Sequence, residues 1–345
     1  MSTQHEISIP FSLLPEESQQ HFRLLELPPD LLDVITADNA SPLYLKSPPT
    51  AQGTVVICTD NDTYPIRQVS TSNSLFITSP SFPLPDSLSS PGIQAIAQCT
   101  TTLELLPPDS SASAVPFIRA AVPVYASTGS KGTGKAVTKR ELFDSIPLSE
   151  AECETVWRKL ACFELEGGVA VVPSESVRLQ VWRGILTAAR AEGADLTVAV
   201  DNEQCEGLVR GEDDWPEELV GAFLRSISDS AYDGEGMVVD GEKLALSLGL
   251  ALLKDRTANG RNTVAVNDIQ AEWADLMPEP WREKASLGRL ESTIRRENGG
   301  KEITLVDSDS VKAATAVAGA ATEAKSTLGA KRKWHEKFRA AKKTA

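Results

Sequence analysis

The chain has 345 residues, enough for two or three domains, and a formal net charge of −14. No apolar run approaches the roughly 20 residues that cross a bilayer, and residues 1–10 lack the charged-then-apolar pattern of a signal peptide. Its three histidines are His5, His21 and His335, so the body of the chain cannot hold a serine or cysteine triad or a histidine metal centre. We therefore expect a protein of the cytosol or nucleus with no membrane segment.

The cysteines and carboxylates indicate neither a metal site nor a catalytic site. The five cysteines are odd in number and include no Cys-x-x-Cys pair, which favours buried free thiols over a zinc site; they are Cys58, Cys99, Cys153, Cys162 and Cys205. Carboxylate-only catalysis stays open, but the acidic residues form surface-like clusters and no pair is singled out. We expect no catalytic residue, no cofactor and no metal.

The first 128 residues are predicted to be rich in β-strands. Alternating or apolar runs separated by Pro, Asn and Asp predict strands over 43–46, 54–60, 63–70, 72–78 and 93–107. Short strands separated by such turn residues, with almost no helical periodicity, indicate a small barrel or sandwich. Large apolar residues are too few for a closed barrel, so we expect strands of a partner to complete the core.

Residues 129–136 read GSKGTGKA, which fits the Walker A motif at Gly129, Gly134 and Lys135 but not at Ala136. A serine or threonine hydroxyl at that last position holds Mg²⁺ in a true nucleotide-binding loop. The residues that follow read as a newly capped helix. We interpret the run as a linker between two domains, with a nucleotide-dependent enzyme as the less favoured alternative.

Helical patterns begin after the linker. Capping boxes at Thr138/Glu141 and Ser149/Glu152 open two helices. Leu142 and Ile146 face inward from the first helix, and Cys153, Val156, Trp157 and Leu160 form the apolar face of the second. Two short strands then surround Gly167 and Gly168. Helices followed by a β-hairpin make a winged-helix unit.

This unit recurs in pattern, with a helix at 216–227 before strands at 232–240, and a helix at 280–296 before a hairpin at 297–307. The glycines that precede the second strand, Gly168, Gly236 and Gly300, indicate three tandem modules. The tryptophans are expected in the cores of these modules; they are Trp157, Trp182, Trp215, Trp273 and Trp281.

The predicted fold class is α+β, with an N-terminal β-barrel-like module followed by tandem winged-helix domains. The expected segments are a β module at 1–125, a flexible linker at 126–137, winged helices at 138–190, 191–242 and 243–307, and a low-complexity segment with a basic tail at 308–345.

Charge is unevenly distributed along the chain. Residues 201–242 carry 2 basic and 13 acidic residues, a surface that would repel a phosphate backbone. The tail at 331–345 is basic, and we interpret its cations as a nucleic-acid or nuclear-import contact; they are Lys331, Arg332, Lys333, Lys337, Arg339, Lys342 and Lys343. A last helix packed through Trp334 and Phe338 is the alternative for this tail.

Three runs near the N-terminus carry a family resemblance: LLELPPDLLDVI (24–35), LYLKS (43–47) and VVICTDNDTYPIRQVSTSNSLFI (55–77). They resemble the defective-in-sister-chromatid-cohesion subunit of the alternative, RFC-like clamp loader, and the likeness covers most of residues 20–310. The residues that carry the family motif are Cys58, Thr59, Thr63, Tyr64, Arg67, Thr71, Ser72, Asn73 and Ser74.

The resemblance implies a non-catalytic, nuclear adaptor. Its β module would pair with a small cohesion subunit and with the large clamp-loader subunit, through the partner-binding residues Cys58, Thr63, Tyr64, Arg67, Ser72, Asn73 and Ser74. Its winged helices would engage the catalytic subunit of DNA polymerase epsilon, with DNA as a further candidate partner and the sliding clamp an indirect one. A winged-helix transcription factor is the alternative, and the acidic second module disfavours it.

Overall fold

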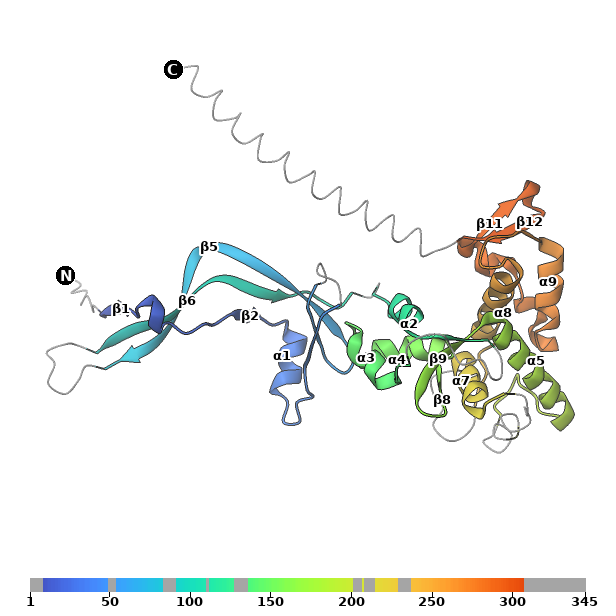
Figure 1. The fold of residues 1–345 in the computed structure, drawn as a ribbon, viewed down its shortest axis with the longest axis horizontal. Helices are drawn as coiled ribbons and strands as arrows, with labels where there is room; N and C mark the ends of the chain where they lie inside the picture. Colours follow the sequence, from blue (N-terminus) through green and yellow to red (C-terminus); the bar gives the residue numbers. More distant parts are fainter. Residues whose placement is uncertain are drawn as a thin grey trace, which may run out of the picture. The chain divides into compact units, whose positions relative to one another are not determined.

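The computed structural model describes residues 9–48, 54–82, 91–109, 112–126, 136–200, 207, 215–228 and 237–306. The chain divides into two compact units (Figure 1). Unit 1 comprises Met1–Pro123, Gly134–Trp157 and Glu166–Ala170. Unit 2 comprises Val124–Thr133, Arg158–Leu165 and Val171–Ala345. No helix among the described residues is long and apolar enough to span a membrane.

Unit 1 is built on one open sheet. Its strands are β1 (Phe11–Leu13), β2 (Leu24–Glu26), β3 (Tyr44–Lys46), β4 (Val56–Cys58), β5 (Thr63–Ser81) and β6 (Gly92–Leu105). The order is β1–β6–β5–β4–β3, and β2 also pairs with β6. The strands β5 and β6 form a long antiparallel ribbon, along which β1 and β2 run parallel to β6. Within the described residues this sheet does not close into a barrel.

The predicted strands are confirmed with one change. The separate strands expected over 63–70 and 72–78 are a single strand, β5, with a shift of register between Ser70 and Leu75. The polar residues between them include no proline or glycine. The chain therefore changes register there without turning.

Two helices of unit 1 were not predicted, α1 (Pro29–Thr36) and α2 (Val115–Ala121), so the expectation of almost no helix in this segment was wrong. The α1 helix is short, but Pro29 stands at its start and Leu31 is fully buried. Leu31 packs with Tyr64 and Leu105, which fixes α1 to the sheet.

The helices α3 (Lys139–Ser145) and α4 (Glu150–Lys159) begin where the capping boxes predict. Thr138 Oγ1 accepts a hydrogen bond from the Glu141 backbone N–H at 3.2 Å, and the Glu141 carboxylate accepts one from the Thr138 backbone N–H at 3.0 Å. The predicted inward residues are buried, and the Phe143 ring meets the Trp157 ring edge-to-face. Both predicted helices are confirmed.

A small three-stranded sheet, whose strand β9 (Val169–Pro173) begins in a segment of unit 1 and continues into unit 2, precedes the helical core of unit 2. The sheet has the order β7–β9–β8, with β7 (Val124–Tyr125) and β8 (Phe163–Leu165). The predicted turn before β9 is confirmed, because Gly167 and Gly168 have φ angles of 93° and 77°, where side chains are strained. The core helices are α5 (Glu175–Glu192), α7 (Glu217–Ile227) and α8 (Gly241–Arg256).

Two tryptophans dominate the core of unit 2. Trp182 and Trp273 are fully buried, and their indole N–H groups donate to the carbonyls of Leu276 at 2.6 Å and Ala245 at 3.1 Å. A Cβ atom on Gly249 would lie 2.4 Å from the Trp273 ring, so only glycine fits there. The core prediction is confirmed for these two and for Trp157, whereas Trp215 and Trp281 are half-buried.

The C-terminal part of unit 2 departs from its prediction. It contains β10 (Val264–Ala265), α9 (Val266–Asp275), two 3-10 helices η2 (Glu279–Lys284) and η3 (Leu287–Thr293), β11 (Ile294–Glu297), η4 (Asn298–Gly300) and β12 (Glu302–Leu305). The helix expected over 280–296 was wrong. Pro278 and Pro280 restrict its first turn, Gly288 interrupts it, and the β-branched Thr293 and Ile294 favour the strand that follows.

The second predicted module, at 191–242, is only partly seen among the described residues. The helix at 216–227 is confirmed as α7, but the strand at 232–240 appears only as two isolated bridges, Val200 with Met237 and Ser228 with Val239. Much of the acidic 201–242 segment lies outside the described residues.

Candidate partner-binding surface

The motif predicted to bind partners begins in the turn between β4 and β5. The Thr59 hydroxyl accepts hydrogen bonds from the backbone N–H groups of Asn61 at 3.3 Å and Asp62 at 2.9 Å. The Thr59 N–H donates to the Asp62 carbonyl at 2.9 Å. A threonine hydroxyl that binds its own backbone in this way stabilises a tight turn. The turn leaves the Asp60 and Asn61 carbonyls available as acceptors.

This turn is hydrogen-bonded to the start of α4. The Thr63 hydroxyl donates to the Glu152 carboxylate at 2.5 Å and accepts from the Ser149 backbone N–H at 2.7 Å. The Ala151 N–H donates to the Asp60 carbonyl at 3.0 Å. Thr63 is buried, so these bonds form away from water and each is costly to break. Thr63 therefore joins the sheet to the capping box of α4 within unit 1.

A second attachment runs from β3 to the segment between α3 and α4. The Lys46 ammonium donates to the backbone carbonyls of Phe143 at 2.9 Å and Leu148 at 2.8 Å. Sequence reasoning missed this role, as it missed the contacts that Ser149 and Glu152 make with Thr63. The Ser149/Glu152 capping box was visible in the sequence, but its third partner is 86 residues away from Ser149.

The cysteines beside this joint are inert. Burial raises the pKa of the Cys153 thiol to about 12, and burial is also the main cause that raises the pKa of Cys58. Both thiols therefore stay neutral near pH 7, and a neutral thiol is a poor nucleophile. Cys58, Cys99, Cys153 and Cys162 are buried and free, as predicted, whereas Cys205 lies outside the described residues.

The structure divides the predicted binding residues into two groups. Cys58, Thr63 and Tyr64 are buried and hold unit 1 together. Arg67, Ser72 and Asn73 lie exposed along β5. The Ser74 side chain lies outside the described part of the structure. Only the second group is accessible to a partner.

The exposed group lies on a strand that pairs on one side only over most of its length. Beyond Pro65, β5 pairs with β6 alone among the described strands, so residues 67–70 and 75–81 present an open row of backbone donors and acceptors on the side away from β6. We call this row the β5 edge. Arg67 pairs with Glu104 on β6 at 2.5 Å, where the register sets the two residues opposite one another. An open edge of this length is a template for strand addition.

Large apolar side chains are exposed on or directly after β5 and on the neighbouring strands β6 and β1, which lie on the side of β5 away from the β5 edge. Phe11, Leu13, Leu75, Phe76, Phe82 and Ile93 are each at least 38% exposed. The rings of Phe11 and Phe76 meet edge-to-face at 5.9 Å. Contiguous apolar surface beside an open edge marks a site of protein association.

The outer edge of β3, on the same side of the sheet as the β5 edge, has the same character. Strand β3 pairs only with β4 among the described strands. Leu43, Tyr44, Leu45 and Val55 are exposed there, and Leu45 is 71% exposed. We call residues 43–46 the β3 edge. The sheet thus offers two edges for added strands.

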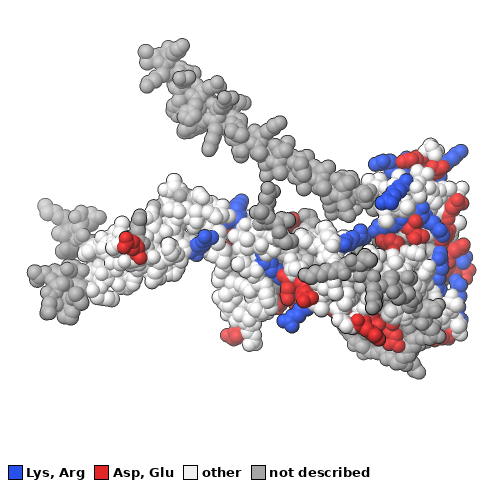
Figure 2. Space-filling view, viewed as in Figure 1, with Lys and Arg blue, Asp and Glu red and all other residues white. Residues whose placement is uncertain are grey.

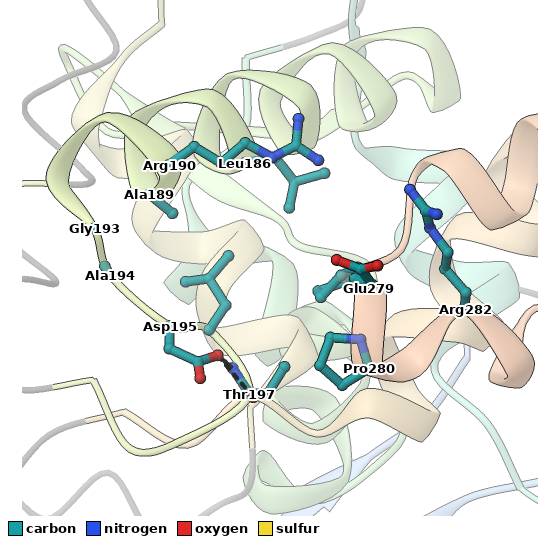
Figure 3. A pocket seen from close by; sticks show the side chains of 12 residues that line it. Leu186, Ala189, Arg190, Gly193, Ala194, Asp195, Thr197, Glu279, Pro280 and Arg282 are labelled. Atoms are coloured by element: carbon teal, nitrogen blue, oxygen red, sulfur yellow. Dashed lines mark hydrogen bonds between the residues drawn. The ribbon is translucent and has the colours of Figure 1, made fainter.

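A shallow pocket of about 370 Å³ lies in unit 2, between the end of α5 and the start of η2 (Figure 3). Its charged lining comes from Arg190, Asp195, Glu279 and Arg282. The Asp195 carboxylate accepts from the Thr197 hydroxyl and backbone N–H, which lowers the pKa of Asp195. These groups do not form a nucleophile–base pair. Among the described residues, no cluster of His, Cys, Asp and Glu could hold a metal ion.

Two further predictions concern residues outside the described ranges. The basic-tail cations fall there; they are Lys331, Arg332, Lys333, Lys337, Arg339, Lys342 and Lys343. Gly129, Gly134 and Lys135 of the Walker-like run fall there as well, so both interpretations stay predictions.

One comparison with known proteins gives a match. The family model described as sister chromatid cohesion protein Dcc1 matches residues 22–312, which include both the β motif and the elements of unit 2 through β12. No curated protein matches the chain. The matched range agrees with the resemblance found in the sequence.

Proposed function

We propose that this chain, which belongs to the Dcc1 family of sister chromatid cohesion proteins, acts in cohesion as a non-catalytic subunit of the alternative RFC-like clamp loader. Unit 1 would add strands from the small cohesion subunit and the large clamp-loader subunit. Unit 2 would bind the catalytic subunit of DNA polymerase epsilon in the nucleus. The chain would thereby support loading of the sliding clamp during replication.

The observation that carries this proposal is the open β5 edge with its exposed apolar side chains. A monomer that left Phe11, Leu75 and Phe76 in water would be prone to aggregate. A partner strand along the β5 edge would bond the open backbone groups of residues 67–70 and 75–81, and its side chains would cover the apolar surface. The buried residues of the motif also support a partner-binding role for β5, because Thr63 attaches the β5–β6 ribbon to α4.

The order of elements at the end of unit 2 supports a winged helix. A helix (α8), a short strand (β10), a helix (α9) and then the β11–β12 hairpin follow one another, and β12 lies between β10 and β11 in the sheet. The place of a recognition helix is taken by the 3-10 helices η2 and η3. Such short helices are poorly suited to reading a DNA groove.

The charges of this module favour a protein partner over DNA. Lys284 binds the Glu242 carboxylate at 2.6 Å, and Arg289 binds the same carboxylate. Arg183 and Arg256 share Glu272 at 3.0 and 2.7 Å. Figure 2 shows basic and acidic side chains interspersed over unit 2. A cation that is already paired with a carboxylate neutralises a DNA phosphate poorly. It therefore releases few of the counterions whose release drives DNA binding.

The proposal is tested by co-expressing the full chain with the small cohesion subunit. We expect a stable complex, which Leu75→Lys and Phe76→Lys together disrupt, because both lysines would have to be desolvated at the interface. Val198→Lys is the matched control, since Val198 is an exposed apolar residue of unit 2. A complex that survives both edge substitutions would contradict the proposed surface.

A further inference from the structure

Serine precedes proline four times in the chain, at Ser41, Ser47, Ser79 and Ser90, and the rest of the sequence has no such pair. A following proline disfavours the α conformation of the serine and holds it extended. Proline-directed serine kinases bind this extended pair, because proline brings no backbone N–H that would be buried without an acceptor. All four pairs lie within one 51-residue stretch, 41–91, of unit 1.

Two of these serines have the accessibility that a kinase needs. Ser41 and Ser47 are exposed, lie outside the strands and flank β3 on its two sides. Ser79 is half-buried within β5, and Ser90 lies outside the described residues. Ser41 and Ser47 therefore stand at the two ends of the β3 edge.

We propose that a proline-directed serine kinase phosphorylates Ser41 and Ser47, and that the phosphates close the β3 edge to a partner strand. The serine oxygen forms a bond to the γ-phosphorus of ATP, and the bond from that phosphorus to the bridging oxygen of the leaving ADP breaks. The hydroxyl proton passes to a carboxylate of the kinase. This inference rests on the proposed function, because it assigns regulation to an edge that the partner subunits would cover.

The distance over which the phosphate charges act is comparable to half the length of the β3 edge. Ser47 follows Ser41 by six positions, a distance of about 20 Å in an extended chain. Each phosphate carries a charge of about −1.5 to −2, with a screening length of about 8 Å at physiological salt. Each phosphate therefore acts on the half of the β3 edge next to it. A partner strand that buries Leu43 or Leu45 would have to desolvate the nearby charge.

The nearest cation in the sequence cannot neutralise the added charge without cost. Lys46 precedes Ser47, but its ammonium already donates to the Phe143 and Leu148 carbonyls at 2.9 and 2.8 Å. If Lys46 turned to a phosphate on Ser47, the two carbonyls would lose their donor, and β3 would lose its attachment to the α3–α4 segment. Phosphorylation therefore either leaves an uncompensated charge at the edge or loosens the strand.

The first arm of the test maps phosphorylation on the full chain. The purified protein is incubated with a cyclin-dependent kinase and ATP, and phosphopeptides are identified by mass spectrometry. We expect phosphate on Ser41 and Ser47, lost in the Ser41→Ala/Ser47→Ala variant and kept in the Ser79→Ala control. Phosphate on neither serine would overturn the proposal.

The second arm measures binding of the large clamp-loader subunit, the proposed partner left for the β3 edge, before and after kinase treatment. We expect about tenfold weaker binding after treatment, and no change for the double alanine variant. Doubly phosphorylated protein that binds as tightly as untreated protein would overturn the closure of the edge. Untreated protein that fails to bind would contradict the proposed function, whereas the phosphopeptide map would still decide the modification site.

Discussion

Units 1 and 2 differ in how they place their apolar residues. Of the 19 large apolar side chains exposed among the described residues, only Val124, Val198, Val238 and Leu246 belong to unit 2, and the others belong to unit 1. The largest fully buried side chains, Trp182, Trp273 and Phe223, all lie in unit 2. Unit 2 therefore has a core of its own, whereas the sheet of unit 1 leaves much of its apolar surface exposed, which we propose another chain covers.

The largest effect that distinguishes the two units is expected at Trp182. Trp182→Ala would leave a cavity in unit 2 and an unpaired Leu276 carbonyl, with a loss of about 3–5 kcal/mol in the free energy of unfolding. Leu45→Ala in unit 1 is the control, and its effect on the isolated chain should be within about 0.5 kcal/mol. Chemical denaturation of both variants checks this. Equal losses would refute the difference between the units.

A smaller effect is expected at Thr63, which tests whether the buried half of the motif is structural. Thr63→Val keeps the side-chain shape but removes the hydroxyl that binds Glu152 and Ser149. The half-buried Glu152 carboxylate then loses one charge-assisted hydrogen bond and keeps the Ser149 N–H and hydroxyl as donors, at a cost of about 1–3 kcal/mol in the stability of unit 1. Thr63→Ser keeps the hydroxyl and should recover most of the loss. If the valine variant is as stable as wild type but no longer binds partners, Thr63 is a contact residue.

The sequence predicted the local structure of both units better than their long-range contacts. The capping boxes, the β8–β9 turn and the strands β3 to β6 follow from residues close together in the chain. The role of Thr63 depends on Ser149, and that of Lys46 on Phe143, contacts that no local pattern encodes. The exposed part of the candidate site could be expected only in general terms, from the shortage of apolar residues.

Helix assignment failed where local signals competed. The helices α5 and α8 were given no range, although Ser174 and Asp240 cap their starts and Gly193 ends α5 in the left-handed conformation. Their apolar residues run nearly all round, so the amphipathic period is weak. The segment expected as a helix at 280–296 contains Pro280 and Gly288, whose backbone preferences disfavour a continuous α-helix, and it forms two 3-10 helices instead.

Cys153 offers a pH test of the joint in unit 1. Burial raises its pKa to about 12, so the folded state keeps the proton that the unfolded state releases near its ordinary value of 9.0. Stability from this group is fully present below pH 9.0 and is lost as the pH rises toward 12. The slope is at most about 1.4 kcal/mol per pH unit. Urea denaturation at pH 8 to 10 should show a smaller slope in Cys153→Ala than in wild type.

The smallest stability effect is expected at Arg67, in the exposed half of the motif. Its ion pair with Glu104 is exposed to water, and the Arg67 side chain is 59% exposed. Such pairs contribute about 0–1 kcal/mol, so Arg67→Ala should barely change the free energy of unfolding. A double-mutant cycle with Glu104→Ala measures the pair directly. If Arg67 contacts a partner, binding of the small cohesion subunit should weaken in the same variant while its stability does not change. A variant that loses stability and keeps binding would place Arg67 with Thr63 among the structural residues.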